Sequence, residues 1–123
     1  MIHPSARISS TSSVGEGTIL SVNTVVASYT QVGRHVRVNR GALIGHHNHI
    51  EDHVTIGPGA AIASSCRIGE GTYIGIGAKV RDGISIGPHA LAGAGAVIIR
   101  DIPGKVRVVG VPARIAKEHI SEH

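Results

Sequence analysis

Histidines are dense near the middle of the chain. The sequence contains nine of them, and four fall within residues 44–53, namely His46, His47, His49 and His53. An imidazole titrates near neutral pH, so a histidine can accept a proton from a hydroxyl or an amine as a general base. Neutral imidazoles are also common zinc ligands. The cluster therefore indicates a general base, a metal site or an exposed polar surface.

The composition narrows the classes of protein that could carry such a cluster. The 123 residues suit one domain, and the chain has 17 Gly, two Tyr and neither Phe nor Trp, so its core must consist mainly of Ile, Val and Ala. Cys66 is the single cysteine, and in its apolar stretch we interpret it as a packing residue. The formal charge is +4, but the basic residues are scattered and stacking aromatics are scarce. This favours an anionic small ligand and no nucleic acid.

Two further observations bear on the cellular location. The opening segment Met1-Ile2-His3-Pro4 lacks the basic and apolar regions of a signal peptide. Long apolar runs that could span a membrane are missing as well. We therefore expect a soluble, cytoplasmic protein with no membrane partner.

The elements that position the histidines follow from a six-residue period. Stepping by six from Ile2 to Ile98 gives seventeen positions, of which sixteen are Ile, Leu or Val. Four residues after each aliphatic the side chain is nearly always small. Glycine directly follows the aliphatic at eight positions, where we expect tight corners with unusual dihedral angles, namely residues 15, 33, 45, 57, 69, 75, 87 and 93.

A period of six fits neither a helix nor a long alternating strand. It predicts short strands separated by turns, with three strands per coil of 18 residues and coils stacked about 4.8 Å apart. Residues 1–103 would form five to six coils of an all-β parallel β-helix. Pro103-Gly104 breaks the repeat, and residues 104–123 would form a tail that includes a short helix through Ala116 to Ile120.

The 18-residue coil also bears on the metal hypothesis. His35, His53 and His89 would share one column, but Gly71 occupies the place between the last two. Side chains two coils apart reach a common metal at about 2.0 Å only with difficulty. We therefore expect no metal site, and we interpret these three histidines and His49 as surface residues.

The hexad pattern resembles the hexapeptide-repeat acyltransferases over essentially the whole chain. That resemblance implies a left-handed β-helix and a homotrimer. The same prism occurs in the gamma-class zinc carbonic anhydrases, which by resemblance use three histidines from two subunits and an Arg-Gly-Asp-like segment. This sequence contains no such segment. A zinc enzyme of that class and a non-catalytic trimeric scaffold remain the alternatives to an acyltransferase.

Within the acyltransferases, Ile44-Gly45-His46-His47-Asn48 followed by Ile56-Gly57-Pro58-Gly59-Ala60 resembles the enzymes that acetylate sialic acid or a 4-amino nucleotide sugar of the bacillosamine type. The resemblance implies that His46 is the general base. The next residue is usually acidic in that group, whereas here it is His47, whose imidazole can orient its neighbour. Asn48 stands where those enzymes have an inward cysteine.

The same resemblance implies acetyl-CoA as the acyl donor. The segment Val108-Val109-Gly110-Val111-Pro112-Ala113-Arg114 resembles the ending of CoA-dependent members. Five basic residues of this end suit the CoA phosphates: Arg100, Lys105, Arg107, Arg114 and Lys117. Carried over by hexad register, the CoA contacts fall on Ile76 and Ala94, Thr55 takes the place of a thioester-contacting histidine, and the Ser64 N–H would stabilise the oxyanion.

The sequence says less about the acceptor substrate than about the acyl donor. The sugar-modifying relatives carry an N-terminal Rossmann-like domain that binds the nucleotide, whereas this chain begins at Met1 with its first hexad. Either this sequence is one domain of a longer enzyme or the enzyme dispenses with that module, and in both cases nucleotide-sugar specificity does not follow from the resemblance. We expect an acetyl-CoA-dependent acetyltransferase acting on the hydroxyl or the amine of a sugar or aminosugar, and both O-acetylation and N-acetylation remain open.

Overall fold

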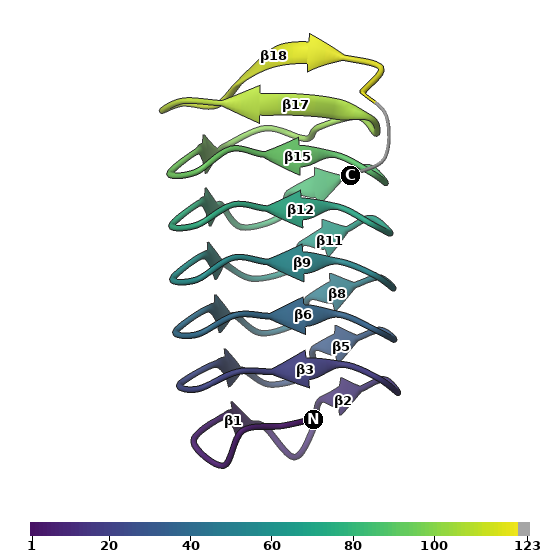
Figure 1. The fold of residues 1–123 in the computed structure, drawn as a ribbon, viewed down its shortest axis with the longest axis vertical. Helices are drawn as coiled ribbons and strands as arrows, with labels where there is room; N and C mark the ends of the chain where they lie inside the picture. Colours follow the sequence, from purple (N-terminus) through teal and green to yellow (C-terminus); the bar gives the residue numbers. More distant parts are fainter. Residues whose placement is uncertain (121–123) are drawn as a thin grey trace.

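The computed structural model describes residues 1–120, which form a triangular stack of about six turns of parallel β-structure. Each side of the triangle is a parallel sheet in which successive strands are 18 residues apart, as in the pairing of Arg7 with Val25. Figure 1 shows the coils stacked along the long axis, with the N-terminus at one end and strands β17 and β18 at the other. The six-residue period and the parallel β-helix are confirmed.

Three sheets make the three faces of the prism. Face 1 contains β1 (Arg7–Ile8), β4 (Val25–Val26), β7 (Leu43–Ile44), β10 (Ala61–Ile62), β13 (Lys79–Val80) and β16 (Val97–Ile98). Face 2 contains β2 (Ser13–Val14), β5 (Gln31–Val32), β8 (His49–Ile50), β11 (Arg67–Ile68) and β14 (Ser85–Ile86). Face 3 contains β3 (Ile19–Leu20), β6 (Arg37–Val38), β9 (Thr55–Ile56), β12 (Tyr73–Ile74), β15 (Leu91–Ala92), β17 (Val106–Val109) and β18 (Arg114–Glu118).

Turns of four residues join the faces, and turns of successive coils stack into three corners. The first corner joins face 1 to face 2 through residues 9–12, 27–30, 45–48, 63–66 and 81–84. The second corner joins face 2 to face 3 through residues 15–18, 33–36, 51–54, 69–72 and 87–90. The third corner joins face 3 to face 1 through residues 21–24, 39–42, 57–60, 75–78 and 93–96.

The aliphatic residue of each hexad fills the prism. Leu20, Ile56 and Ile74 have no exposed surface, and Ile44 is 1% exposed. The small residues four places later are buried beside them, as Ala42 illustrates. In each two-residue strand of the middle coils the second side chain points inward and is buried, so the first points outward. The outward positions therefore decide the chemistry of each face.

The glycines after the aliphatics have a different role from the one expected. None of the eight has a positive φ. A Cβ added to Gly45 would lie 2.5 Å from the carbonyl oxygen of Ala63, and one added to Gly57 would lie 2.7 Å from the nitrogen of Ile76. Close stacking of neighbouring coils requires these glycines. The positive φ angles fall two residues later, at positions such as His47 and Gly59.

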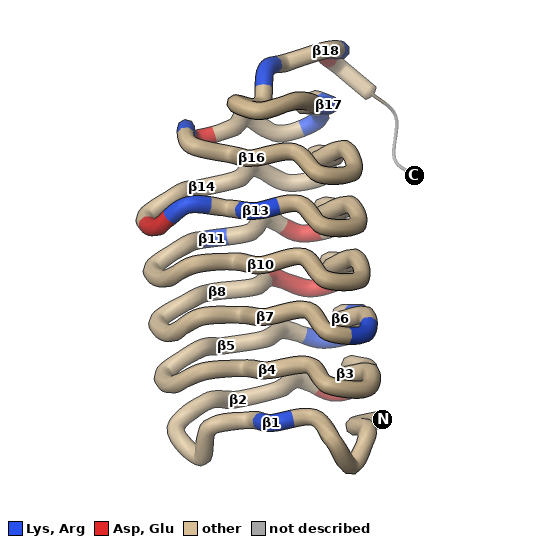
Figure 2. Tube along the Cα trace, turned by 90° about the vertical axis from the view of Figure 1, so that its left-hand side faces the viewer, with Lys and Arg blue, Asp and Glu red and all other residues tan. Residues whose placement is uncertain are grey.

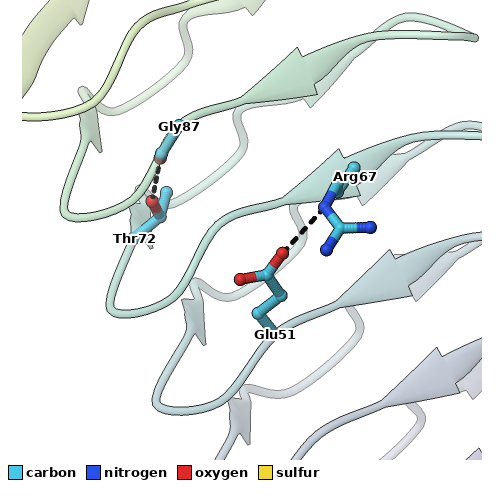
Figure 3. A network of polar contacts seen from close by, with 4 residues as sticks. All are labelled: Glu51, Arg67, Thr72 and Gly87. Atoms are coloured by element: carbon cyan, nitrogen blue, oxygen red, sulfur yellow. Dashed lines mark hydrogen bonds and ion pairs between the residues drawn. The ribbon is translucent and has the colours of Figure 1, made fainter.

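Small polar side chains fasten each corner to the next coil. The Thr30 hydroxyl donates a hydrogen bond of 2.6 Å to the carbonyl of Gly45 and accepts one of 3.2 Å from the N–H of Asn48. Thr72 makes the same pair of bonds, donating to the Gly87 carbonyl at 2.9 Å (Figure 3) and accepting from the N–H of Ala90 at 3.2 Å. These bonds pair backbone groups that the corners would otherwise leave buried and unsatisfied.

The expected tail helix through Ala116 to Ile120 is wrong, because residues 1–120 contain no helix. Strand β17 continues face 3 alongside β15, and the chain then reverses to place β18 antiparallel to β17. Buried Val106 and Val108 alternate with exposed residues along β17, so this segment covers the end of the prism as a strand. Every residue of β18 is exposed, so it offers no apolar face with which a helix could pack.

The outer surface of the prism carries an ion pair. Glu51, on the second corner, forms an ion pair of 2.8 Å with Arg67 of β11 (Figure 3). Among residues 1–120, no helix is long and apolar enough to cross a membrane.

Candidate functional site

His46 and His47 form a pair at the tip of the first corner, in the turn between β7 and β8. Both side chains are exposed, and their Nδ1 atoms lie 3.0 Å apart. The rings meet edge to face, with centroids 5.2 Å apart. One hydrogen can be shared between the two Nδ1 atoms, so one imidazole donates and the other accepts. The Nε2 atoms take no part in this bond.

Two residues, Gly45 and Asn48, hold the turn that carries this pair. Gly45 allows the next coil to approach within contact distance. The buried Asn48 side chain donates to the carbonyl of Gly45 at 3.0 Å and to that of Ala63 at 2.6 Å, and its oxygen accepts from the N–H of Cys66 at 2.8 Å. Asn48 thus closes its own turn and fastens it to the following coil, so both ends of the His46-His47 segment are fixed.

Ser64 lies one coil beyond His46 in the same corner. The N–H of Ser65 donates to the His46 carbonyl at 3.1 Å, which joins the two turns. The Ser64 N–H itself points to the carboxylate of Asp82, at the long distance of 3.4 Å. The structure therefore brings Ser64 to His46 and directs its N–H at an anionic oxygen.

Ile76 and Ala94 lie on the third corner, on consecutive coils. The Ile76 carbonyl accepts a 2.8 Å hydrogen bond from the N–H of Gly95, so the two turns stack directly. The Ile76 side chain is 54% exposed, which is high for an isoleucine in this chain. These two residues come together as expected, but face 1 separates them from His46.

Thr55 is brought close to neither group. It is the outward residue of β9 on face 3, with Arg37 and Tyr73 as its partners on the neighbouring strands. It lines a shallow hollow with His53, Tyr73 and Leu91. Within a single chain, the expected site residues thus occupy two corners and one face.

The surface between the two corners is apolar. Face 1 presents Val25, Leu43 and Ala61 outward, and these residues line a hollow of about 460 Å³ whose cationic member is Lys79. Leu43 is 49% exposed. Figure 2 looks onto this face, where the strands carry Lys or Arg at β1 and β13 and are otherwise uncharged. An apolar hollow between two corners is a suitable place for contact with another chain.

The second corner carries three of the four histidines interpreted as surface residues, and the fourth, His49, lies on β8 of face 2. The rings of His35 and His53 stack with centroids 5.4 Å apart, and His89 lies two coils beyond His53. Within residues 1–120, no three His, Cys, Asp or Glu side chains gather closely enough to hold a metal ion. Cys66 is buried beside the first corner, its thiol donates to the Arg81 carbonyl at 3.1 Å, and burial raises the pKa of that thiol.

The basic residues of the tail gather at one end of the prism. Arg107 of β17 is paired with Lys117 of β18, and Arg114 starts β18 at the opposite end of the hairpin. All three are exposed. Sequence reasoning placed these residues near an anionic ligand, but it missed the hairpin that presents them. The alternation Val106-Arg107-Val108 was the available signal.

A contact that sequence reasoning missed adds an aromatic ring to the first corner. The ring of Tyr29 lies 5.1 Å from that of His47, measured between centroids. Tyr29 and His47 are 18 residues apart, so the coil length could have revealed this neighbour.

Comparison with known proteins gives a consistent result. The sequence matches no protein-family model and no curated protein sequence. A histidine-to-asparagine variant of perosamine N-acetyltransferase from Caulobacter crescentus, solved with CoA and GDP-perosamine, is 33% identical with a TM-score of 0.94, over 95% of this chain and 56% of that one. The acetyltransferase domain of PglB from Neisseria gonorrhoeae, solved with acetyl coenzyme A, is 37% identical with a TM-score of 0.90, over 93% and 56%.

A third solved structure, WeeI from Acinetobacter baumannii, is 33% identical with a TM-score of 0.88, over 91% of this chain and 55% of that one. This chain thus spans 55–56% of the length of these three proteins. The architecture matches the left-handed β-helix of these enzymes over nearly all of the chain. The similarity confirms the resemblance to the hexapeptide-repeat sugar acetyltransferases.

Proposed function

We propose that this protein transfers the acetyl group of acetyl-CoA to the amine of an aminosugar, with His46 as the general base. The exposed His46-His47 pair carries the proposal, because it gives a positioned imidazole with a free Nε2 at a corner of the prism. The similarity to an N-acetyltransferase solved with CoA and GDP-perosamine supports an amine as the acceptor. Acetylation of a sugar hydroxyl would use the same residues.

The chemistry is a direct transfer. The amine nitrogen attacks the thioester carbonyl carbon, a C–N bond forms, and His46 Nε2 takes the proton that the nitrogen loses. Collapse of the tetrahedral intermediate breaks the C–S bond. The proton on His46 then passes to the CoA sulfur, so the base returns to its neutral form without a covalent enzyme intermediate.

His47 fixes the orientation of the base. If His46 accepts a proton at Nε2, its Nδ1 must carry the hydrogen that His47 Nδ1 accepts. This bond selects one tautomer of each ring and supports the imidazolium that forms on His46. A neutral imidazole supports that cation more weakly than a carboxylate would.

The Ser64 N–H is proposed to stabilise the oxyanion of the tetrahedral intermediate. In the free protein this donor faces the Asp82 carboxylate at 3.4 Å, so an oxyanion would replace one anionic acceptor with another. Ile76, Ala94 and Thr55 are proposed to contact the pantetheine arm and the thioester. The basic residues of the β17–β18 end are proposed to face the CoA phosphates.

A homotrimer would complete this site. His46 and Ile76 lie at opposite edges of face 1, so a single chain does not bring the base to the proposed acetyl donor. If three copies turn their apolar faces 1 toward a common threefold axis, the first corner of one copy meets the third corner of the next. Burial of Val25, Leu43 and Ala61 would favour that arrangement.

The proposal is tested by titrating the purified chain with acetyl-CoA in a calorimeter and by assaying acetyl transfer to GDP-perosamine. We expect binding by wild type and by His46→Ala alike, with turnover of His46→Ala reduced by about 10²–10⁴-fold. His49→Ala, which changes a nearby half-buried histidine on face 2, is the matched control and should keep its turnover. Absence of acetyl-CoA binding would refute the proposal, and full activity of His46→Ala would refute the role of His46.

A further inference from the structure

Tyr29 is an unusual residue for its position in the first corner. It occupies the left-handed region with φ of 55°, which bulky side chains rarely adopt. The equivalent residues of the following coils are His47, Ser65 and Gly83. The structure thus retains an aromatic ring where a small residue would fit the backbone better.

The contacts of Tyr29 leave most of the ring available. Its side chain is 60% exposed, and its ring packs against His47 at an interplanar angle of 30°. Within residues 1–120 the phenol hydroxyl makes no hydrogen bond. His47 in turn contacts His46, so the free ring surface of Tyr29 adjoins the histidine pair.

Three hydroxyl groups form a hydrogen-bonded group beside the backbone of Tyr29. The hydroxyls of Ser9 and Thr11 lie 2.9 Å apart, and Ser9 donates to the hydroxyl of Ser28 at 3.4 Å. Thr11 also accepts a hydrogen bond from the N–H of Tyr29 at 3.1 Å. An aromatic ring beside a group of hydroxyls suits a pyranose, which presents C–H groups on its face and hydroxyls at its edge.

The order of the coils assigns this surface to one of the two substrates. Ser64, Ile76 and Ala94 all lie on coils that follow His46, and these residues are proposed to contact the acetyl donor. Tyr29 lies on the coil that precedes His46, on the opposite side of the base (the coils run in sequence order along the long axis in Figure 1). The residues proposed to contact the acetyl donor occupy the coils beyond His46, and the two substrates cannot fill the same space, so we place the acceptor on the side of Tyr29.

We infer that Tyr29, with the hydroxyls of Ser9, Thr11 and Ser28, forms the subsite that binds the sugar ring of the acceptor. This inference rests on the proposed acetyl transfer at His46. Tyr29 packs against one face of the pyranose, and the hydroxyls bind its polar edge. The acceptor amine is thereby presented to His46 Nε2.

Binding is tested by proton NMR on a Tyr73→Phe variant, in which Tyr29 is the one remaining tyrosine. The variant is saturated with CoA and titrated separately with GDP-perosamine, D-glucosamine and GDP. We expect saturable shifts of the Tyr29 ring signals with at least one of the two aminosugar compounds and none with GDP. The inference would be overturned if neither aminosugar compound shifted the Tyr29 signals. It would also be overturned if GDP shifted them as much as GDP-perosamine does.

Kinetics with GDP-perosamine distinguishes two possible roles of the Tyr29 ring, which are to bind the sugar and to hold His47 in place. Asn tolerates positive φ, so Tyr29→Asn removes the ring without straining the corner. We expect the KM for the aminosugar to rise about tenfold or more, with kcat and the KM for acetyl-CoA within about twofold of wild type. Tyr29→Phe retains the ring and should stay close to wild type. A fall in kcat with an altered pH profile would instead make Tyr29 a support for the base and overturn the sugar subsite.

A control and a prior measurement keep the two proposals distinct. His35→Asn makes a comparable change at φ of 53° in the second corner of the same coil, and it should leave the KM for the aminosugar unchanged. Calorimetry with acetyl-CoA tests the donor site, which does not involve Tyr29. Failure to bind acetyl-CoA counts against the proposed function, whereas normal binding with an unaffected KM in Tyr29→Asn counts against the subsite.

Discussion

Replacement of Asn48 by Ala should destabilise the protein and impair the His46 turn together. Asn48 is 2% exposed, and its amide makes three hydrogen bonds to backbone groups. The variant removes all three. Within residues 1–120 the N–H of Cys66 and the carbonyl of Ala63 have no other partner, whereas the Gly45 carbonyl keeps its bond from Thr30.

The magnitude follows from these bonds. A net contribution of about 1 kcal/mol for each hydrogen bond gives a loss of about 3 kcal/mol in the free energy of unfolding. Thr72→Ala is the matched control, because it removes two bonds of the same kind from the second corner, away from His46. Its expected loss is about 2 kcal/mol.

The assay is guanidinium unfolding followed by circular dichroism, at one protein concentration for all variants, together with turnover at a temperature where each variant is folded. We expect both variants to unfold earlier than wild type, and turnover to fall in Asn48→Ala but not in Thr72→Ala. Stability of Asn48→Ala within 1 kcal/mol of wild type would refute the account of the corner. Equal loss of turnover in both variants would refute the specific link between Asn48 and the base.

Three further outcomes test other parts of the structure. In His47→Asp a carboxylate would accept the Nδ1 hydrogen of His46 and support the imidazolium more strongly than an imidazole does, so turnover in the acetyl-transfer assay should be at least that of wild type, and loss of turnover would contradict the pairing. Burial raises the pKa of the Cys66 thiol, so less thiolate is present at a given pH, and Ellman's reagent should label Cys66 only after unfolding; rapid labelling of the native protein would contradict its burial. In Gly75→Ala the new Cβ would lie 2.8 Å from a backbone oxygen of the next coil, so thermal unfolding should show a loss of stability of about 2–3 kcal/mol. The Cβ of Gly77→Ala meets no atom within 4 Å, so this variant should lose only about 1 kcal/mol, from its positive φ; equal losses would argue against tight coil stacking.

The candidate site was partly readable from the sequence. The 18-residue coil placed Ser64 beyond His46 and stacked Ala94 on Ile76, because equivalent residues of successive coils must lie one above another. The hydrogen bond between His46 and His47 was not readable, since it depends on two side-chain rotamers in an exposed turn. The role of Asn48 was also missed in detail, because its partners Ala63 and Cys66 belong to the next coil.

The tail shows the opposite balance. We expected a helix there, since Ala116 and Lys117 favour helices and the hexad repeat does not continue into this segment. The structure makes this segment a strand because the free edge of face 3 offers unpaired backbone groups that only another strand can satisfy. The helix propensities of the tail residues carry no information about this unpaired edge of the sheet.

The prism, its core and the column in which each residue stands follow from the hexad pattern alone. A strict six-residue period leaves one arrangement that buries an aliphatic residue in every hexad. Which side chains meet across coils, and which corners lie far apart, depends on the folded chain. Those relations, from the His46-His47 bond to the separation of His46 from Ile76 by face 1, depend on side-chain directions and on the width of the prism, which no local spacing encodes.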